Sequence, residues 1–199
     1  TYLLNGTIEY KCADCDAEYT EEIPMLGQTA LSNCTVTLSY YKTAYDGKEK
    51  TPKVTVKNSN GIVSEEDYTV TYADNVNAGN AKVIITAKTG DVSIKGTVEK
   101  GFTIAKAKQS VSAASTDEQI HVKTSTEIQA DGIGDISLKT STPDLVDIKE
   151  TTVTGKKAGL ALIKVTVSGD ENHEEASTMV AVGVNENHVI EQMIENQKT

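Results

Sequence analysis

Apolar and polar residues alternate with a period of two along the whole chain, and no other feature of the sequence constrains its fold as strongly. The alternating segments are residues 35–38, 53–57, 68–72, 81–87, 128–130, 136–138, 162–167 and 180–184. Successive side chains of a β-strand point to opposite faces of a sheet, so this period is typical of strands that bury one face. The sequence therefore predicts an all-β fold.

Short turn motifs separate the alternating segments. Each contains glycine or asparagine, residues that tolerate the positive φ angles of tight hairpins. The motifs are Asp46-Gly47, Asn60-Gly61 and residues 77–80, 89–91, 131–135, 154–156 and 168–170. Many short strands with turns at this spacing indicate β-sandwiches.

Charge limits the partners that such a chain can have. The 199 residues carry 29 acidic and 19 basic side chains, for a net charge of −10, and every basic residue is lysine. Phosphate backbones repel an acidic surface, and arginine, the usual bidentate ligand of phosphate and guanine, is missing. We therefore expect no nucleic-acid partner. The sequence also lacks the run of about 18 apolar residues that a membrane-spanning helix needs, and we expect a monomer.

Composition changes divide the sequence into four segments. A short polar stretch near residue 106 separates two modules of similar length, 31–106 and 107–184. Residues 1–30 precede them and hold two of the three cysteines. Residues 185–199 form a tail with the apolar spacing of a short amphipathic helix, or the start of a following segment. The chain begins at Thr1 without a signal peptide, and we expect a signal or anchor to lie outside it.

The first module resembles a repeat found in surface proteins of Gram-positive bacteria. The matching residues are Tyr41, Tyr45-Asp46-Gly47-Lys48, Pro52, 67–72, Asn77-Ala78-Gly79 and Phe102-Thr103-Ile104. The resemblance implies an immunoglobulin-like β module. The residues themselves also leave open a β-grasp arrangement, in which a helix crosses one sheet. The only candidate for that helix is the stretch 64–66.

The second module resembles the group 2 bacterial immunoglobulin-like domain. The matching residues are Ser141-Thr142-Pro143, Val146, Ile148, 153–159 and 161–167. Residues 9–27 are in turn similar to a Cys-x-x-Cys hairpin that often precedes such modules. Together the resemblances imply two tandem immunoglobulin-like sandwiches behind a short hairpin, in a secreted or cell-wall-associated bacterial surface protein. None of them implies catalysis.

Cys12 and Cys15 have the spacing of half a zinc site, in which two thiolates on a tight turn bind one tetrahedral ion. The candidates for the remaining ligands are Cys34, His121, His173 and His188. A disulfide is the competing hypothesis, because proteins outside the cytosol meet oxidising conditions. Free thiols are the third. Under each hypothesis the site is structural, and structural zinc is the only cofactor that the sequence suggests.

The sequence leaves three functions open, and none of them gives this chain an enzymatic activity. The first is a non-catalytic spacer or adhesion stalk at the cell surface. The second is a binding module for a host or cell-wall protein or glycan. Sugars commonly stack on aromatic rings, so this function needs an exposed platform of tyrosines drawn from Tyr40, Tyr41, Tyr45, Tyr68 and Tyr72. The third is an accessory segment of a larger secreted enzyme.

Overall fold

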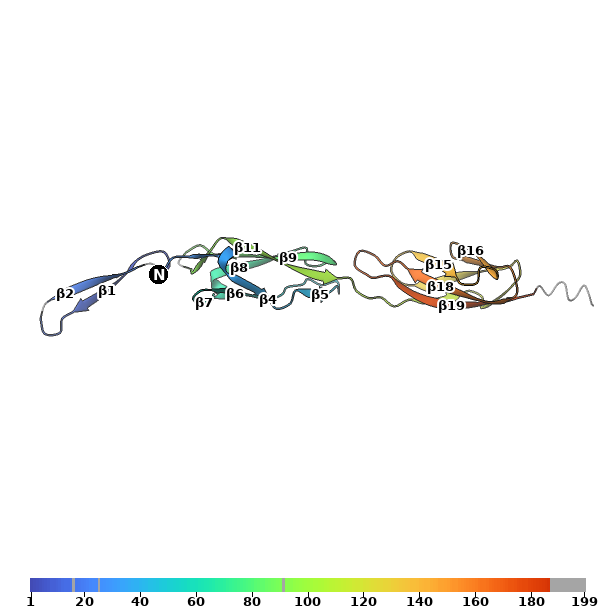
Figure 1. Cartoon of the computed structure of the whole chain (residues 1–199), viewed down its shortest axis with the longest axis horizontal. Helices are drawn as coiled ribbons and strands as arrows, with labels where there is room; N and C mark the ends of the chain where they lie inside the picture. The colour runs from blue at the N-terminus through green and yellow to red at the C-terminus, as the bar shows by residue number, and fades with distance from the viewer. Residues whose placement is uncertain (16, 25, 91, 187–199) are drawn as a thin grey trace, which may run out of the picture. The chain divides into compact units, whose positions relative to one another are not determined.

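The computed structural model describes all residues except 16, 25, 91 and 187–199 (Figure 1). Within the described residues the regular secondary structure is almost entirely β-strand, which confirms the predicted all-β class. It separates into two compact units, the first ending at Ala105 and the second beginning at Lys106. The helix predicted for the tail falls, from residue 187, outside the described residues. No helix in the described part is long and apolar enough to cross a bilayer.

Unit 1 holds eleven strands and two single turns of 3₁₀ helix. The strands are β1 (Gly6–Lys11), β2 (Glu18–Ile23), β3 (Thr29–Ala30), β4 (Thr35–Leu38), β5 (Lys42–Ala44), β6 (Val54–Asn58), β7 (Gly61–Ile62), β8 (Tyr68–Ala73), β9 (Gly79–Ala87), β10 (Ile94–Lys95) and β11 (Thr97–Ala105). The helical turns are η1 (Leu31–Asn33) and η2 (Glu65–Asp67). β1 and β2 form a hairpin, and the main sheets have the orders β4-β6-β7 and β5-β11-β9-β8.

The two main sheets of unit 1 share one apolar core. The alternating residues of β4 and β6 supply it from one sheet, and those of β9 and β11 supply it from the other. Val56, Val83 and Ile85 have no exposed surface. Because both sheets bury their apolar faces in the same cluster, unit 1 is a sandwich.

The stretch 64–66, the candidate for a helix crossing a sheet, forms only the single turn η2. Ser64 begins this turn, and its Oγ accepts a hydrogen bond from the Glu66 N–H at 3.3 Å. One turn is too short to cross a sheet. The sheet orders of unit 1 are accordingly those of a sandwich and not of a β-grasp arrangement.

Unit 2 holds eight strands in two sheets of four. The strands are β12 (Ser112–Ser115), β13 (Gln119–His121), β14 (Ser125–Asp131), β15 (Ile136–Thr140), β16 (Val146–Lys149), β17 (Thr152–Gly155), β18 (Gly159–Val167) and β19 (Ala176–Asn185). The sheet orders are β12-β14-β17-β16 and β13-β19-β18-β15. Ile163, Val165 and Val182 are fully buried between the sheets, with Val153 facing them from β17.

In each sandwich the first part of the chain runs parallel to the last strand. In unit 1, β3 pairs with β10 and β5 pairs with β11, both in parallel. In unit 2, Ala107 bridges His173 just before β19, and β13 pairs in parallel with the second half of β19. The chain therefore enters each sandwich beside the start of its last segment and leaves at the opposite end.

Candidate functional site

The hairpin of β1 and β2 has one apolar face and one polar face. Its antiparallel register brings Tyr10 opposite Tyr19 and Gly6 opposite Ile23. Alternation then places Ile8, Tyr10, Tyr19 and Ile23 on one face, together with the single carboxylate of Glu21, which lies opposite Ile8. The other face carries Thr7, Glu9, Lys11, Glu18, Thr20 and Glu22. The hairpin is thus amphipathic in the same way as the strands of the sandwiches.

The apolar face of the hairpin is exposed. Ile8, Tyr10, Tyr19 and Ile23 keep between 39% and 64% of their surface accessible. The rings of Tyr10 and Tyr19 stack with centroids 5.9 Å apart, and the Tyr10 hydroxyl donates to Glu21 at 3.1 Å. Four large apolar side chains are therefore exposed together on one face of the hairpin.

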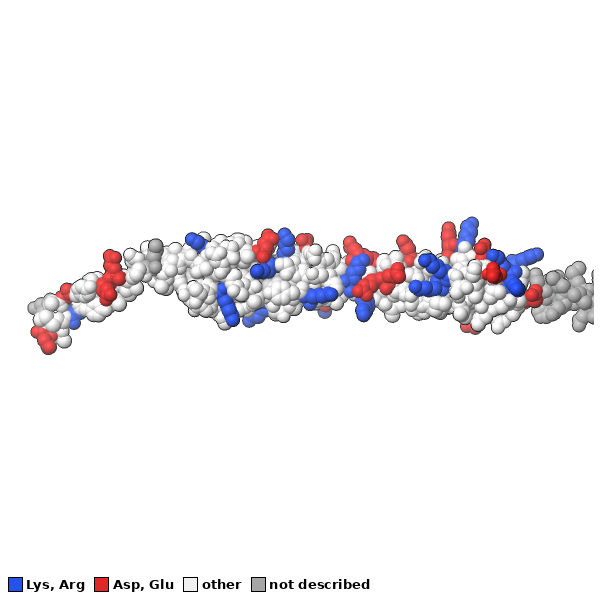
Figure 2. All heavy atoms as spheres, viewed as in Figure 1, with Lys and Arg blue, Asp and Glu red and all other residues white. Residues whose placement is uncertain are grey.

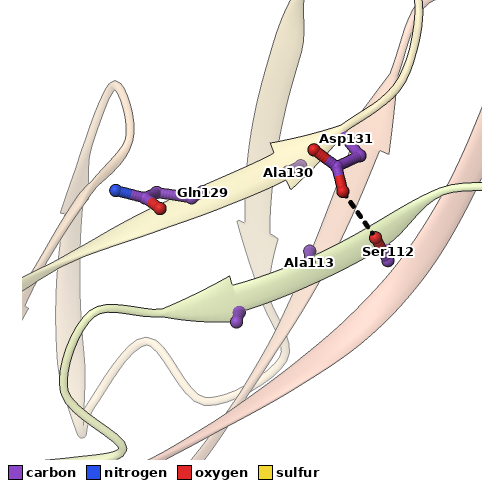
Figure 3. A pocket seen from close by; sticks show the side chains of 6 residues that line it. Ser112, Ala113, Gln129, Ala130 and Asp131 are labelled. Carbon is purple, nitrogen blue, oxygen red and sulfur yellow. Dashed lines mark hydrogen bonds between the residues drawn. The ribbon is translucent and has the colours of Figure 1, made fainter.

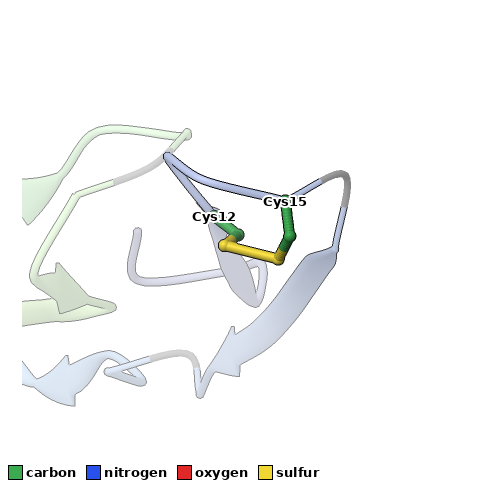
Figure 4. The surroundings of a disulfide bond; sticks show 2 residues. All are labelled: Cys12 and Cys15. Carbon is green, nitrogen blue, oxygen red and sulfur yellow. A yellow bond between two sulfur atoms is a disulfide. The ribbon is translucent and has the colours of Figure 1, made fainter.

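A disulfide joins Cys12 to Cys15 at the tip of the hairpin (Figure 4). The Cys12 N–H donates to the Ala17 carbonyl at 3.0 Å, which closes the turn around the bond. A sulfur atom in a disulfide is not a thiolate ligand, so the disulfide and zinc hypotheses for Cys12 and Cys15 exclude each other. Among the described residues, no three histidine, cysteine or acidic side chains gather as a metal site. Zinc stays a prediction from the sequence.

Thiol counting distinguishes these hypotheses. If Cys12 and Cys15 form the disulfide, the denatured, unreduced chain should titrate as one free thiol. Its intact mass should also be lower than that of the reduced chain by two hydrogen atoms. An extra mass of one zinc ion under native conditions, removed by a chelator, would contradict the disulfide and support the metal. Three free thiols without metal would contradict both.

Cys34, the third cysteine, is half-buried beside the core of unit 1. Its Sγ donates to the Ala30 carbonyl at 3.5 Å, and desolvation raises the pKa of the thiol. The thiolate is the reactive form of cysteine, so a raised pKa makes Cys34 a poor nucleophile. This environment suits a packing role.

The loop after Tyr45 is held together by a pair of opposite charges. The Asp46 carboxylate accepts hydrogen bonds from the Lys50 Nζ at 2.6 Å and the Lys48 N–H at 2.9 Å. The hydrogen bond from Lys50 lowers the pKa of Asp46 most, and the bond from the Lys48 N–H lowers it further. The Lys50 main chain exchanges two further hydrogen bonds with Asn75, at 2.8 and 3.1 Å. The Tyr-Asp-Gly motif thus has a structural explanation: it fixes this loop against the segment that follows β8.

The tyrosines of the first module do not form one exposed platform. Tyr68 is only 5% exposed, and Tyr40, Tyr45 and Tyr72 pack against the core. Tyr41 alone in this group is more than half exposed. The structure therefore assigns four of the five rings to packing, and the aromatic surface that glycan stacking requires is not built from this set.

Asp170 organises a loop of unit 2 in a similar way. Its carboxylate accepts hydrogen bonds from the N–H groups of Asn172 and His173 and from the His173 Nδ1 at 2.8 Å. Desolvation alone would raise the pKa of Asp170, but these hydrogen bonds outweigh it and lower that pKa. His121 lies elsewhere, with its Nδ1 2.9 Å from the Glu186 carbonyl. His173 thus stabilises a local turn, whereas His121 links the end of β13 to the residue that follows β19.

A hollow in unit 2 lies along the paired strands β12 and β14 (Figure 3). Gln129, Ala113 and Ala130 line it, and at one end the Ser112 hydroxyl donates to Asp131 at 3.1 Å. The two polar groups at that end already bond each other across the strands. The arrangement ties β12 to the sheet, and its alanine walls supply little that would orient a bound molecule.

Comparison with known proteins does not assign this chain to a family. No protein-family model matches it, and no curated protein matches it. Among solved structures, surface-layer protein SbsC, domains 1–6, aligns over 92% of this chain with 12% identity and a TM-score of 0.30. This chain covers 35% of that structure. S-layer protein SbsC domains 4 and 5 align over 77% of this chain and 96% of theirs, with 14% identity and a TM-score of 0.28. Scores this low do not establish a common fold.

The sequence analysis did not identify the apolar face of the hairpin. Part of the signal was present, because apolar and polar residues alternate in β1 from Gly6, but Glu21 interrupts the alternation in β2. The Cys-x-x-Cys spacing between these strands instead indicated a zinc site or a disulfide. Only the register shows that the apolar residues of both strands share one face.

Proposed function

We propose that this chain is a non-catalytic spacer or adhesion stalk of a secreted or cell-wall-associated bacterial surface protein. The observation that carries the proposal is the parallel pairing of the first and last segments in both sandwiches. A unit that receives the chain at one end and releases it at the other can be placed in series without the chain folding back.

The length of the last strand sets the distance that each unit places between its entry and exit points. β19 has 10 residues and β11 has 9. At about 3.3 Å per residue, each unit separates the two ends of its chain by roughly 30 Å. A spacer built from such units gains length in proportion to their number.

The strand order supports the immunoglobulin-like identity that we propose for the modules. If the strands of unit 2 are lettered A, A′, B, C, D, E, F and G in chain order, its sheets read A-B-E-D and A′-G-F-C. This is the strand arrangement of immunoglobulin-type sandwiches. Unit 1 repeats the A′-G-F-C sheet, with β8 and β9 as C and F, and has a shorter second sheet. The sequence resemblances point to the same families.

The surface and the disulfide suit an extracellular setting. Figure 2 shows lysine and acidic side chains interspersed over both sandwiches, which favours solubility. The Cys12–Cys15 disulfide is of a kind that persists in oxidising compartments. Both features support the proposed location at the cell surface.

Small-angle X-ray scattering tests the spacer function. Two units in series should give the chain a maximum dimension above about 60 Å, because each contributes roughly 30 Å. Its radius of gyration should lie well above the value of about 16 Å typical of a compact domain of this length. A radius near that compact value would contradict the proposal, because it would mean that the units fold back on each other.

A further inference from the structure

The hairpin carries an apolar surface together with a concentrated negative charge. Residues 1–26 contain six acidic side chains (Glu9, Asp14, Asp16, Glu18, Glu21 and Glu22) and one lysine, Lys11. The difference between one positive and six negative charges is −5, which is half of the net charge of the whole chain. In Figure 2 most of the charged atoms visible on the hairpin are acidic, whereas both signs are mixed on the sandwiches.

The charge is unequally shared between the two strands of the hairpin. On β1, Glu9 is balanced by Lys11, whose Nζ also lies 2.9 Å from Glu18. β2 carries Glu18, Glu21 and Glu22 and no basic residue. Its apolar residues, Tyr19 and Ile23, are 64% and 44% exposed and lie on either side of Glu21 on one face, whereas Glu18 and Glu22 lie on the other face.

β2 also has a free hydrogen-bonding edge in the described structure. β1 and β2 form a two-stranded sheet to which no other described strand is added. One edge of β2 pairs with β1, so the main-chain groups on its other edge face outward. Such an edge is a template for a further strand, and a two-stranded hairpin alone is marginally stable in water.

We propose that β2 is the docking edge for an extended, cationic segment of a partner protein, in which basic and apolar residues alternate. Added to β2, its main chain would complete a three-stranded sheet. Its lysines or arginines would lie beside Glu18 and Glu22 on the polar face, and its apolar side chains beside Tyr19 and Ile23 on the other. This binding role goes beyond the proposed spacer function.

Charge favours this occupant over two others. A second copy of this chain would bring two hairpins of charge −5 together, and like charges oppose that contact. A neutral glycan could stack on Tyr10 and Tyr19 but would gain nothing from the surrounding carboxylates. A cationic strand with alternating apolar residues uses both faces, because its basic side chains meet the carboxylates of Glu18 and Glu22 and its apolar side chains cover Tyr19 and Ile23.

The test uses the full chain and a short synthetic peptide in which lysine and valine alternate. Fluorescence anisotropy should show binding that weakens as salt is added, because the attraction is electrostatic. Replacing both Glu18→Gln and Glu22→Gln should weaken binding about fivefold or more. Glu174→Gln with Glu175→Gln removes the same charge from unit 2 and should leave the affinity within about twofold of the original.

A second peptide tests strand addition without altering the protein. It has the same sequence, but alternate backbone nitrogens are methylated, so that it keeps its charge and side chains while losing the N–H groups that would pair with β2. We expect its binding to be lost. In NMR spectra, only the unmethylated peptide should shift the amide signals of residues 18–23.

Several results would overturn the proposal. One is that the alternating peptide does not bind. Another is that the methylated peptide binds as tightly as the unmethylated one. A third is that the Glu174 and Glu175 substitutions weaken binding as much as the Glu18 and Glu22 substitutions do. Concentration-dependent self-association that is abolished by Tyr19→Ser would assign the apolar face to a second copy instead. None of these results changes the scattering prediction for the monomer, so this proposal and the spacer function fail independently.

Discussion

Replacing Ile163 with alanine should lower the free energy of unfolding of unit 2 by about 3 kcal/mol and leave unit 1 unaffected. Ile163 lies in the middle of β18 with no exposed surface, and it packs in a core made only of unit 2 residues. The substitution removes buried methyl and methylene groups and leaves a cavity. Leu162→Ala is the matched control, because Leu162 is adjacent on the same strand but 42% exposed. It should cost less than about 1 kcal/mol.

The uneven distribution of aromatic residues makes this measurement simple. All eight tyrosines lie between Tyr2 and Tyr72, and unit 2 has no tyrosine, phenylalanine or tryptophan. Tyrosine fluorescence during urea unfolding therefore reports on unit 1 alone, and far-ultraviolet circular dichroism reports on both units. An Ile163→Ala protein whose tyrosine transition moves would show that the two units unfold together. A Leu162→Ala protein as unstable as Ile163→Ala would contradict the assignment of the core.

Replacing Gly134 with alanine should destabilise unit 2 by at least about 3 kcal/mol. Gly134 has a φ of +108°, and a Cβ there would overlap the Gly169 carbonyl oxygen and lie 2.6 Å from the Ser168 Oγ. The neighbouring Asp135 exchanges two hydrogen bonds with Ser168, both 3.0 Å long, so the two loops cannot separate without losing them. Backbone strain and steric overlap therefore act together.

Gly61→Ala in unit 1 separates these two causes. Gly61 has a similar φ of +121°, but no atom lies within 4 Å of the position that a Cβ would occupy. Only the backbone strain remains, and the expected cost is about 1–2 kcal/mol. Urea unfolding followed by circular dichroism for Gly134→Ala and by tyrosine fluorescence for Gly61→Ala measures both. Equal costs would mean that steric overlap at Gly134 is relieved by movement of the loop containing Gly169.

The sequence contained the information for strand positions because side-chain alternation is a local property. Each of the eight alternating segments overlaps a strand, and residues 35–38 coincide with β4. The turn at Asp46-Gly47 lies between strands and that at Asn60-Gly61 leads into β7, with positive φ at both glycines. Alternation requires only neighbouring residues and the pleat of the backbone. The all-β class therefore followed directly from the sequence.

The environments of individual polar and aromatic residues could not be derived in this way. Lys50 is 8% exposed because the Asp46 carboxylate meets its ammonium group within the same loop. Tyr68 is buried while Tyr41 is exposed, although both belong to tyrosine-rich segments of the same module. Whether a residue of intermediate polarity is buried depends on the volume and polar groups that other segments place around it.

The features that carry the functional proposals were decided by the tertiary structure. β5 and β13 are three-residue strands with no strong alternation, yet each pairs in parallel with the last strand of its sandwich, about 60 residues away. The residues of β5 and β13 do not by themselves select the last strand as a partner. The pairing depends on which sheet edge remains free when the rest of the sandwich has formed. The apolar face of the hairpin was likewise encoded residue by residue in β1 and β2. It became a surface only through the register that brings Tyr10 opposite Tyr19.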